Sequence, residues 1–215
     1  MRAILVAVAA VALATPAIAQ SSKLELRAVV YGLPSSRIAA LDATTVGETS
    51  GTMTGGEMSF RGGKVGLLLR LISGDLTAAS GSAGDGTLTT GEARIQAGPR
   101  LGALDVGYGR RAVSGSLGST VYSYIRVGGS SVLEIGGTGL SARISAAVYL
   151  AGQGVPNTTV SGHEIMTALE YAVRRTPLVV TLGYRAEVFQ PSSSGREQPE
   201  NVSGIIVGGG VRLTR

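Results

Sequence analysis

The stretch Lys23–Leu33, KLELRAVVYGL, alternates between apolar and polar side chains along most of its length. One side of it carries Leu24, Leu26, Ala28 and Val30, and the other carries Glu25, Arg27 and Tyr31. A period of two is typical of a β-strand, because successive side chains of a strand point to opposite faces. The stretch therefore predicts a strand with one apolar face and one charged face.

The same alternation recurs through the chain, from Gly56–Arg61 near the start to Val207–Thr214 at the end. We identify about ten such segments, and no segment beyond the first residues has a convincing helical period. The pattern predicts an all-β fold, an up-and-down antiparallel β-barrel of about ten strands, with eight strands as the alternative.

The connections between these segments are of two kinds. Short turns rich in Gly and Pro are expected at 61–64, 98–101, 136–139 and 174–177. Longer stretches of small and polar residues are expected to be loops at 34–51, 74–86, 112–118, 152–162 and 190–201. Short periplasmic turns and long external loops are typical of outer-membrane barrels, so both ends of the barrel domain are expected on the periplasmic side.

Residues Met1–Ala19 have the features of a cleaved secretory signal peptide. Arg2 precedes the apolar run Ala3–Ala14, and Ala17-Ile18-Ala19 provides the small residues of a cleavage site. The run is shorter than the roughly 18 apolar residues of a membrane-spanning helix, which makes a membrane anchor the weaker alternative. Residues 20–215 are then expected to form one barrel domain. The chain has no cysteine, which excludes disulfides and thiolate chemistry.

The two-faced strands leave open which face points outward. A soluble barrel buries its apolar face, whereas a membrane barrel turns that face toward lipid. The apolar face here carries almost no charge, and the polar face pairs acids with bases and holds many of the glycines. We therefore expect a transmembrane barrel, and a soluble periplasmic ligand-binding barrel remains an alternative.

In its alternating strands, its turn rhythm and its Ala17-Ile18-Ala19 signal, the chain resembles the small bacterial outer-membrane β-barrels, the OmpA/OmpX-like class in a broad sense. The resemblance implies residence in the outer membrane of a diderm bacterium. It also implies contact with outer-membrane lipid including lipopolysaccharide, insertion by the barrel-assembly machinery, and a monomeric state. Two features depart from that class: the chain ends in Val211–Arg215 without a terminal aromatic residue, and it has no Trp.

The sequence offers little support for catalysis or for bound groups. His163 is the single histidine, and with Ser161 or Glu164 it could serve as a general base. Alternation, however, places His163 and Glu164 on opposite faces. No Gly-x-Ser-x-Gly motif and no metal-ligand cluster occurs, so we expect no enzyme, no metal and no cofactor. Nucleic acid is not an expected partner, because no basic cluster is interleaved with aromatic residues.

The polar face is the candidate functional region. A set of charged residues is expected to line the lumen: Glu25, Arg27, Glu57, Arg61, Arg70, Glu92, Arg94, Asp105, Arg126, Glu134, Arg143, Glu170, Arg185, Glu187 and Arg212. Buried charges are tolerated when they are paired, which favours an ion-paired plug. The expected role is structural, or surface interaction through the external loops. The alternative is a narrow porin-like channel for ions or small polar solutes.

Overall fold

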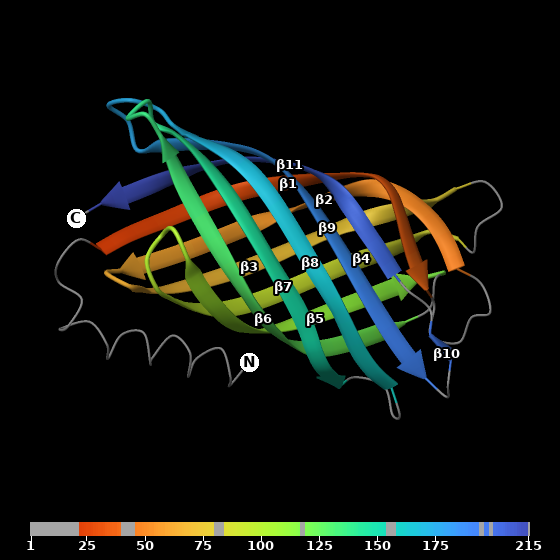
Figure 1. The fold of residues 1–215 in the computed structure, drawn as a ribbon. Helices are drawn as coiled ribbons and strands as arrows, with labels where there is room; N and C mark the ends of the chain where they lie inside the picture. The colour runs from red at the N-terminus through yellow and green to blue at the C-terminus, as the bar shows by residue number, and fades with distance from the viewer. Residues whose placement is uncertain are drawn as a thin grey trace.

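A computed structural model of the chain describes residues 22–39, 46–79, 84–116, 119–153, 158–193, 196–197 and 200–214. These residues form a closed antiparallel barrel (Figure 1). Its ten wall strands are β1 (Ser22–Ala39), β2 (Val46–Gly62), β3 (Val65–Ala78), β4 (Gly86–Ala97), β5 (Ala103–Gly115), β6 (Thr120–Ile135), β7 (Leu140–Gln153), β8 (Thr158–Ala172), β9 (Leu178–Ser193) and β11 (Glu200–Thr214). The two-residue β10 (Arg196–Glu197) pairs with the end of β9.

Each wall strand pairs with the next along the chain, and β11 pairs with β1 to close the barrel. The predicted all-β, up-and-down barrel of ten strands is thereby confirmed. Strand β1 begins and β11 ends at the same end of the barrel, which we call the turn end (Figure 1). The opposite end is called the loop end. Among the described residues, no helix is long and apolar enough to cross a membrane.

The four predicted short turns are present at the turn end, where they join β2 to β3, β4 to β5, β6 to β7 and β8 to β9. In the β6–β7 turn, Gly136 and Gly137 have φ of 55° and 64°. Consecutive positive φ values of this kind are what a tight hairpin requires, and glycine adopts them without steric cost.

The predicted long loops are wrong in extent. Strand β1 continues to Ala39 and β2 begins at Val46, so most of the stretch 34–51 is barrel wall. The other four stretches are shortened in the same way. Small and polar residues give these stretches little hydropathy contrast, so alternation is not visible in them. The backbone of such residues nevertheless pairs in a closed barrel as readily as that of apolar residues. The strands exceed the roughly 9–11 residues that a tilted strand needs to cross a bilayer.

The inward-facing glycines allow neighbouring strands to approach closely. A Cβ atom built on Gly55 would lie 2.0 Å from the backbone carbonyl oxygen of Leu71, and one on Gly210 would lie 2.1 Å from that of Leu26. No side chain fits such a gap, because the obstructing atom belongs to the backbone of the next strand. The close approach of neighbouring strands at these positions therefore requires glycine on the polar face.

We expect Gly55→Ala to destabilise the barrel by about 1–3 kcal/mol, the usual cost of overpacking a tightly filled interior. The free energy of unfolding in denaturant would measure it. Gly32→Ala is the matched control, because nothing lies within 4 Å of a Cβ built at Gly32. Equal stabilities for the two variants would contradict the close approach.

The predicted signal peptide Met1–Ala19 lies outside the described residues.

Candidate functional site

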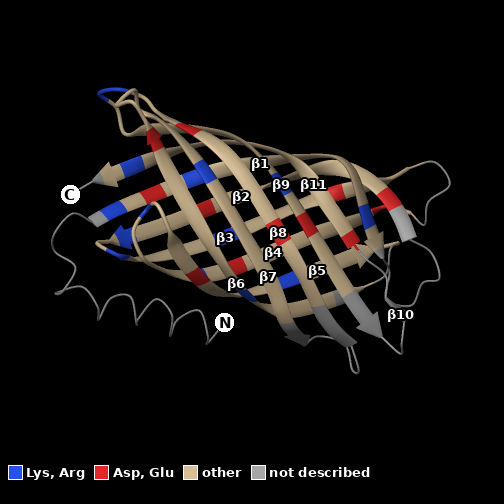
Figure 2. Cartoon of the chain, in the orientation of Figure 1, with Lys and Arg blue, Asp and Glu red and all other residues tan. Residues whose placement is uncertain are grey.

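The barrel places its charges inside and its apolar side chains outside. Large exposed apolar residues occur around the whole wall, among them Leu71, Ile95, Leu104, Ile125, Ile144, Ile165, Leu182 and Ile205. Buried charged residues include Glu25, Arg70, Glu92, Arg94, Asp105, Arg111, Arg126, Glu164, Glu170, Arg185, Glu187 and Glu200. Charged residues recur along the middle of the strands (Figure 2). This distribution is the reverse of that in a water-soluble protein, in which such residues are almost never buried.

A first group of ion pairs lies nearest the turn end. Glu170 on β8 is 2.8 Å from the guanidinium groups of both Arg27 on β1 and Arg143 on β7. Glu25 accepts hydrogen bonds from Arg27 and from Arg212, the latter at 2.8 Å. The group joins β7, β8, β11 and β1 across the interior, so it ties together strands that are distant in sequence.

The central group is built around Glu164 of β8, whose side chain is fully buried. Its carboxylate lies 2.6 Å from Arg185, 3.1 Å from Arg126 and 3.8 Å from Arg94. The hydroxyl of Tyr149 donates a fourth contact at 2.8 Å. One carboxylate therefore contacts three arginines that come from β4, β6 and β9.

Further pairs extend the central group along the barrel. Arg70 lies 2.7 Å from Glu57 and 3.7 Å from Glu92. Arg126 contacts Glu92 at 3.4 Å and also donates to Asp105. Because each charge has an opposite charge within reach, the cost of burying it is offset.

A third group lies toward the loop end. Arg111 of β5 is 2.9 Å from Glu200 and 3.6 Å from Glu187. Its guanidinium also lies 4.5 Å from the ring centroid of Phe189. Glu187 in turn contacts Arg185 of the central group. The central and third groups thus form one continuous set of ion pairs, whereas no ion pair between described residues joins the first group to it.

Aromatic side chains fill the space beside this third group. The rings of Tyr149 and Phe189 stack with centroids 4.5 Å apart, and Tyr124 meets Tyr149 edge-on at 4.8 Å. Tyr124 also covers Gly109, since a Cβ built on Gly109 would lie 2.2 Å from the Tyr124 ring. The four rings of this aromatic cluster are those of Tyr122, Tyr124, Tyr149 and Phe189.

The interior is less uniformly charged than the sequence predicts. A second, apolar cluster contains Val29, Tyr31, Leu33, Ile38, Met53, Ile72, Leu76, Leu88, Val113, Met166, Val202 and Ile206. Several of its members, such as Ile38, Leu76 and Val113, belong to stretches predicted as loops. Those stretches continue the strands instead, and their apolar side chains turn inward. Toward the loop end, the interior therefore combines this apolar cluster with the aromatic cluster and the third group of ion pairs.

Little space remains between these side chains. Among the described residues, cavities of about 30 and 70 Å³ lie beside the first and central groups of ion pairs, and one of about 10 Å³ lies between the apolar cluster and Arg185. A single water needs about 10–15 Å³ measured in this way. The cavities are thus large enough for a few waters at most, far less than a water-filled pore requires.

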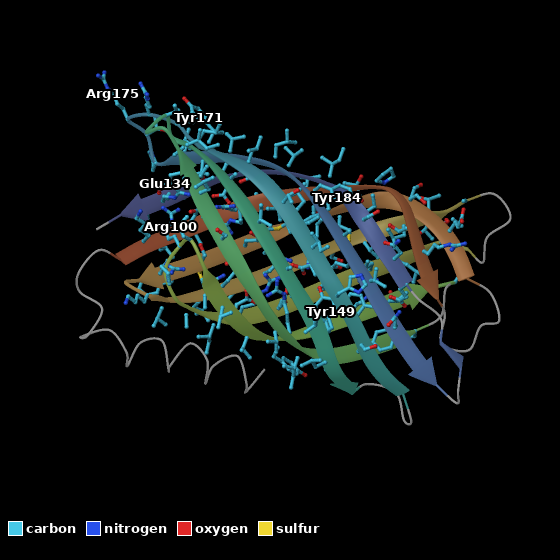
Figure 3. The ribbon with its side chains drawn as sticks, in the orientation of Figure 1. Arg100, Glu134, Tyr149, Tyr171, Arg175 and Tyr184 are labelled. Carbon is cyan, nitrogen blue, oxygen red and sulfur yellow. The ribbon has the colours of Figure 1, made fainter. Side chains whose placement is uncertain are left out.

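Thirteen of the fifteen predicted lumen residues take part in these three groups of ion pairs. Arg61 instead donates to the backbone carbonyl of Gly98 near the turn end. The prediction is wrong for Glu134, whose side chain is 70 % exposed and pairs with Arg100 of the β4–β5 turn (Figure 3). Pairing of β6 with β5 stops at Ser130, so Glu134 lies on a hairpin that extends beyond the neighbouring wall.

Three residues at the heart of the interior are absent from the predicted set. Arg111 and Glu164 satisfy the same alternation as the others and could have been found from it. Glu200 could not, because it lies in the stretch 190–201 that was predicted as a loop.

The structure does not bring His163 and Glu164 together, so they do not form the general base considered from the sequence. His163 is exposed on the outer wall, whereas Glu164 is buried inside the barrel. Within the described ranges, no group of three or more His, Cys, Asp or Glu residues is placed to hold a metal ion.

No protein-family model matches the chain, and no curated protein matches it. Solved structures do match. One is the crystal structure of an outer membrane channel from Pseudomonas putida F1, which is 9 % identical in sequence and superposes with a TM-score of 0.44. The match covers 91 % of this chain and 96 % of that one. This similarity is too low to support a functional assignment, so the function is inferred from the chain's own geometry.

Proposed function

We propose that the chain is an outer-membrane β-barrel with a sealed, ion-paired interior and a structural or surface-interaction role. The observation that supports this most directly is the inverted distribution of side chains. An apolar outer wall with a charged interior is stable where lipid, and not water, surrounds the barrel. Export through a cleaved signal peptide, insertion by the barrel-assembly machinery, contact with lipopolysaccharide and a monomeric state belong to the same proposal.

The filled interior favours a sealed barrel over a channel. A barrel of about eight to ten strands encloses little more than its own side chains, whereas porins with aqueous channels have 16 to 18 strands. Here ion pairs fill the middle and the turn end of the interior, and an apolar cluster, an aromatic cluster and further ion pairs fill the part toward the loop end. An ion that crossed the barrel would have to break these ion pairs and to lose its hydration beside apolar side chains.

The external loops contribute less to the proposed role than the sequence suggests. The wall strands extend far into the predicted loops, so the strands themselves form much of what projects beyond a bilayer. On β1 and β2 the outward pair Arg37–Glu48, at 3.6 Å, has both side chains more than half exposed. A polar pair on the outer wall indicates a part of the barrel that stands clear of the hydrocarbon.

Two measurements test the proposal together. In cell fractionation, we expect the protein in the outer membrane, and recovery from the soluble periplasm would support the ligand-binding alternative instead. In planar lipid bilayers, we expect no steady conductance steps from the purified protein. A porin reconstituted at the same protein-to-lipid ratio serves as the positive control. Steady open steps would overturn the sealed interior and establish the channel.

A further inference from the structure

The largest of the three interior cavities, about 70 Å³, lies in the mouth of the barrel at the turn end. Its charged lining consists of one carboxylate and five cations: Glu25, Lys23, Arg61, Arg100, Arg143 and Arg212. Basic residues mark the turn-end parts of β11, β1 and β2 in Figure 2. The side chain of Arg100 is 32 % exposed, so this turn-end cavity lies where solvent reaches its lining.

Two of these cations face each other without an acid. Lys23 on β1 and Arg61 on β2 are register partners, and both line the turn-end cavity. Like charges directly opposite each other in a sheet are destabilising. Among the described residues, Arg61 donates only to the backbone carbonyl of Gly98, and Lys23 has no side-chain hydrogen bond and no ion-pair partner. This pair therefore lacks the carboxylate that accompanies the other inward arginines of the barrel.

The surplus of positive charge is confined to this end of the interior. The central and third groups contain five arginines and six carboxylates: Arg70, Arg94, Arg111, Arg126 and Arg185 against Glu57, Glu92, Asp105, Glu164, Glu187 and Glu200. Around the turn-end cavity, six cations share three carboxylates: Lys23, Arg27, Arg61, Arg100, Arg143 and Arg212 against Glu25, Glu134 and Glu170. A concave site lined by one sign of charge concentrates ions of the opposite sign, so the turn-end cavity attracts anions.

The size and the chemistry of the turn-end cavity suit a small oxyanion. A single water needs about 10–15 Å³ measured in this way, so there is room for a few water-sized groups. The tetrahedral oxygens of a phosphate fill such a space, whereas a sugar ring or an acyl chain does not fit. The guanidinium group of Arg61 has five N–H donors and binds phosphate oxygens in pairs, so its bond to one carbonyl leaves donors free. Ser59, Gln96 and Ser130 add neutral polar groups to the lining.

We propose that the turn-end cavity binds a phosphate dianion, free or as the terminal monoester of a soluble compound, with Arg61 and Lys23 as its main contacts. Two negative charges offset most of a surplus of three cations, whereas a monoanion leaves two of them uncompensated. A phospholipid is a poorer match, because its phosphodiester has one charge and its acyl chains would have to lie in a polar mouth. Only the periplasmic location of the site rests on the proposed function.

The test is a calorimetric titration of the full-length mature protein, purified in a non-ionic detergent and a chloride buffer at pH 8. The ligands are inorganic phosphate, methyl phosphate as a dianion, dimethyl phosphate as a monoanion, and a short-chain phosphatidylglycerol. We expect one inorganic phosphate or methyl phosphate per barrel. Methyl phosphate should bind about tenfold more tightly than dimethyl phosphate, the ratio that one charge-assisted hydrogen bond implies.

Two variants test the proposed contacts. Arg61→Gln and Lys23→Gln should each weaken the binding of methyl phosphate by about tenfold. Neither variant should fail to fold, because each removes one of two like charges that face each other. Arg175→Gln and Lys64→Gln are the matched controls, since they remove the same charges from exposed turns at the same end (Figure 3). Both controls should bind methyl phosphate within about twofold of the parent chain, because exposed charges are screened by salt.

Several outcomes would overturn the proposal. Binding of methyl phosphate that Arg61→Gln and Lys23→Gln both leave unchanged would exclude the two contacts. Equal losses in the two controls would mean that diffuse charge, and not this cavity, attracts the anion. Equal binding of methyl phosphate and dimethyl phosphate would exclude a site for a dianion, and tighter binding of phosphatidylglycerol would assign the cations to a lipid headgroup.

Failure of this proposal is distinguishable from failure of the proposed function. The titration is made in detergent and depends on neither the membrane location nor the sealed interior. Recovery of the protein from the soluble periplasm, or steady conductance in bilayers, would overturn the proposed function and leave the phosphate site standing. A barrel that is found in the outer membrane and does not conduct, but binds no phosphate, would overturn the site alone.

Discussion

Glu164→Gln should destabilise the folded barrel by about 3–5 kcal/mol, the usual cost of removing one partner from a buried ion-pair network. The substitution keeps the size of the side chain and removes its charge. Arg126 and Arg185 then lose their contacts with a carboxylate at 3.1 and 2.6 Å inside a closed barrel. Reversible unfolding in denaturant, from vesicles or detergent, would measure the loss.

Glu134→Gln provides the matched control for this variant. It makes the same chemical change to a residue that also pairs with an arginine, Arg100, but at an exposed hairpin. Exposed ion pairs contribute about 0–1 kcal/mol, so this variant should unfold close to the parent chain. A Glu164→Gln variant as stable as Glu134→Gln would show that the central ion pairs do not hold the barrel together.

The difference between these two glutamates marks the limit of sequence reasoning. Alternation places both on the inward face, because a period of two assigns a face and nothing more. It does not give the level of a residue along the barrel, which depends on where the neighbouring strand ends. Strand β5 begins at Ala103, opposite Ser130, and this leaves Glu134 without a wall to face. The level of a residue along the barrel follows from the register between neighbouring strands, which the sequence of one strand does not contain.

The fold itself was predictable because apolar and charged residues alternate so cleanly in the central part of each strand. The predictions became unreliable where small polar residues replaced that contrast, as in the stretch 34–51. Polarity there predicts a loop, although Ile38 and Thr49 turn inward in strands, beyond a register shift of β1 between Leu33 and Ser36. A closed sheet satisfies backbone hydrogen bonds whatever its side chains, so weak hydropathy contrast is poor evidence against a strand.

The apolar cluster of the interior is not predicted from the sequence for the same reason. Leu76 and Val113 lie inside stretches predicted as loops, and Tyr122 and Tyr124 belong to the aromatic cluster that closes the barrel beside them. Reading those stretches as loops left only the charged residues to define the lumen. The structure therefore changes the basis of the proposed sealed interior, since apolar and aromatic packing contributes to it beside the ion pairs.

Leu182→Arg should destabilise the barrel in a bilayer by about 2–4 kcal/mol, the cost of an arginine on the lipid-facing side of a barrel near the bilayer midplane. Leu182 is exposed on the outer wall, with the exposed apolar residues Leu169 and Val207 as its partners on β8 and β11. In a soluble barrel the same change at an exposed position would alter stability by about 0.5 kcal/mol or less. Unfolding from phospholipid vesicles would therefore separate the two interpretations of the outward face.

Gln190→Arg is the control for this substitution on the same strand. Gln190 is also exposed on the outer face, but it lies toward the loop end and pairs with Ser161 on β8. The cost of an outward arginine falls to about 0–1 kcal/mol near the membrane interface, so this variant should be nearly as stable as the parent chain. If the Leu182 variant loses much stability and the Gln190 variant almost none, the cost depends on depth in the bilayer. A barrel surrounded by water would not show such a dependence. Equal, small effects at both positions would mean that the apolar wall does not face lipid, and the inverted distribution of side chains would then need another explanation.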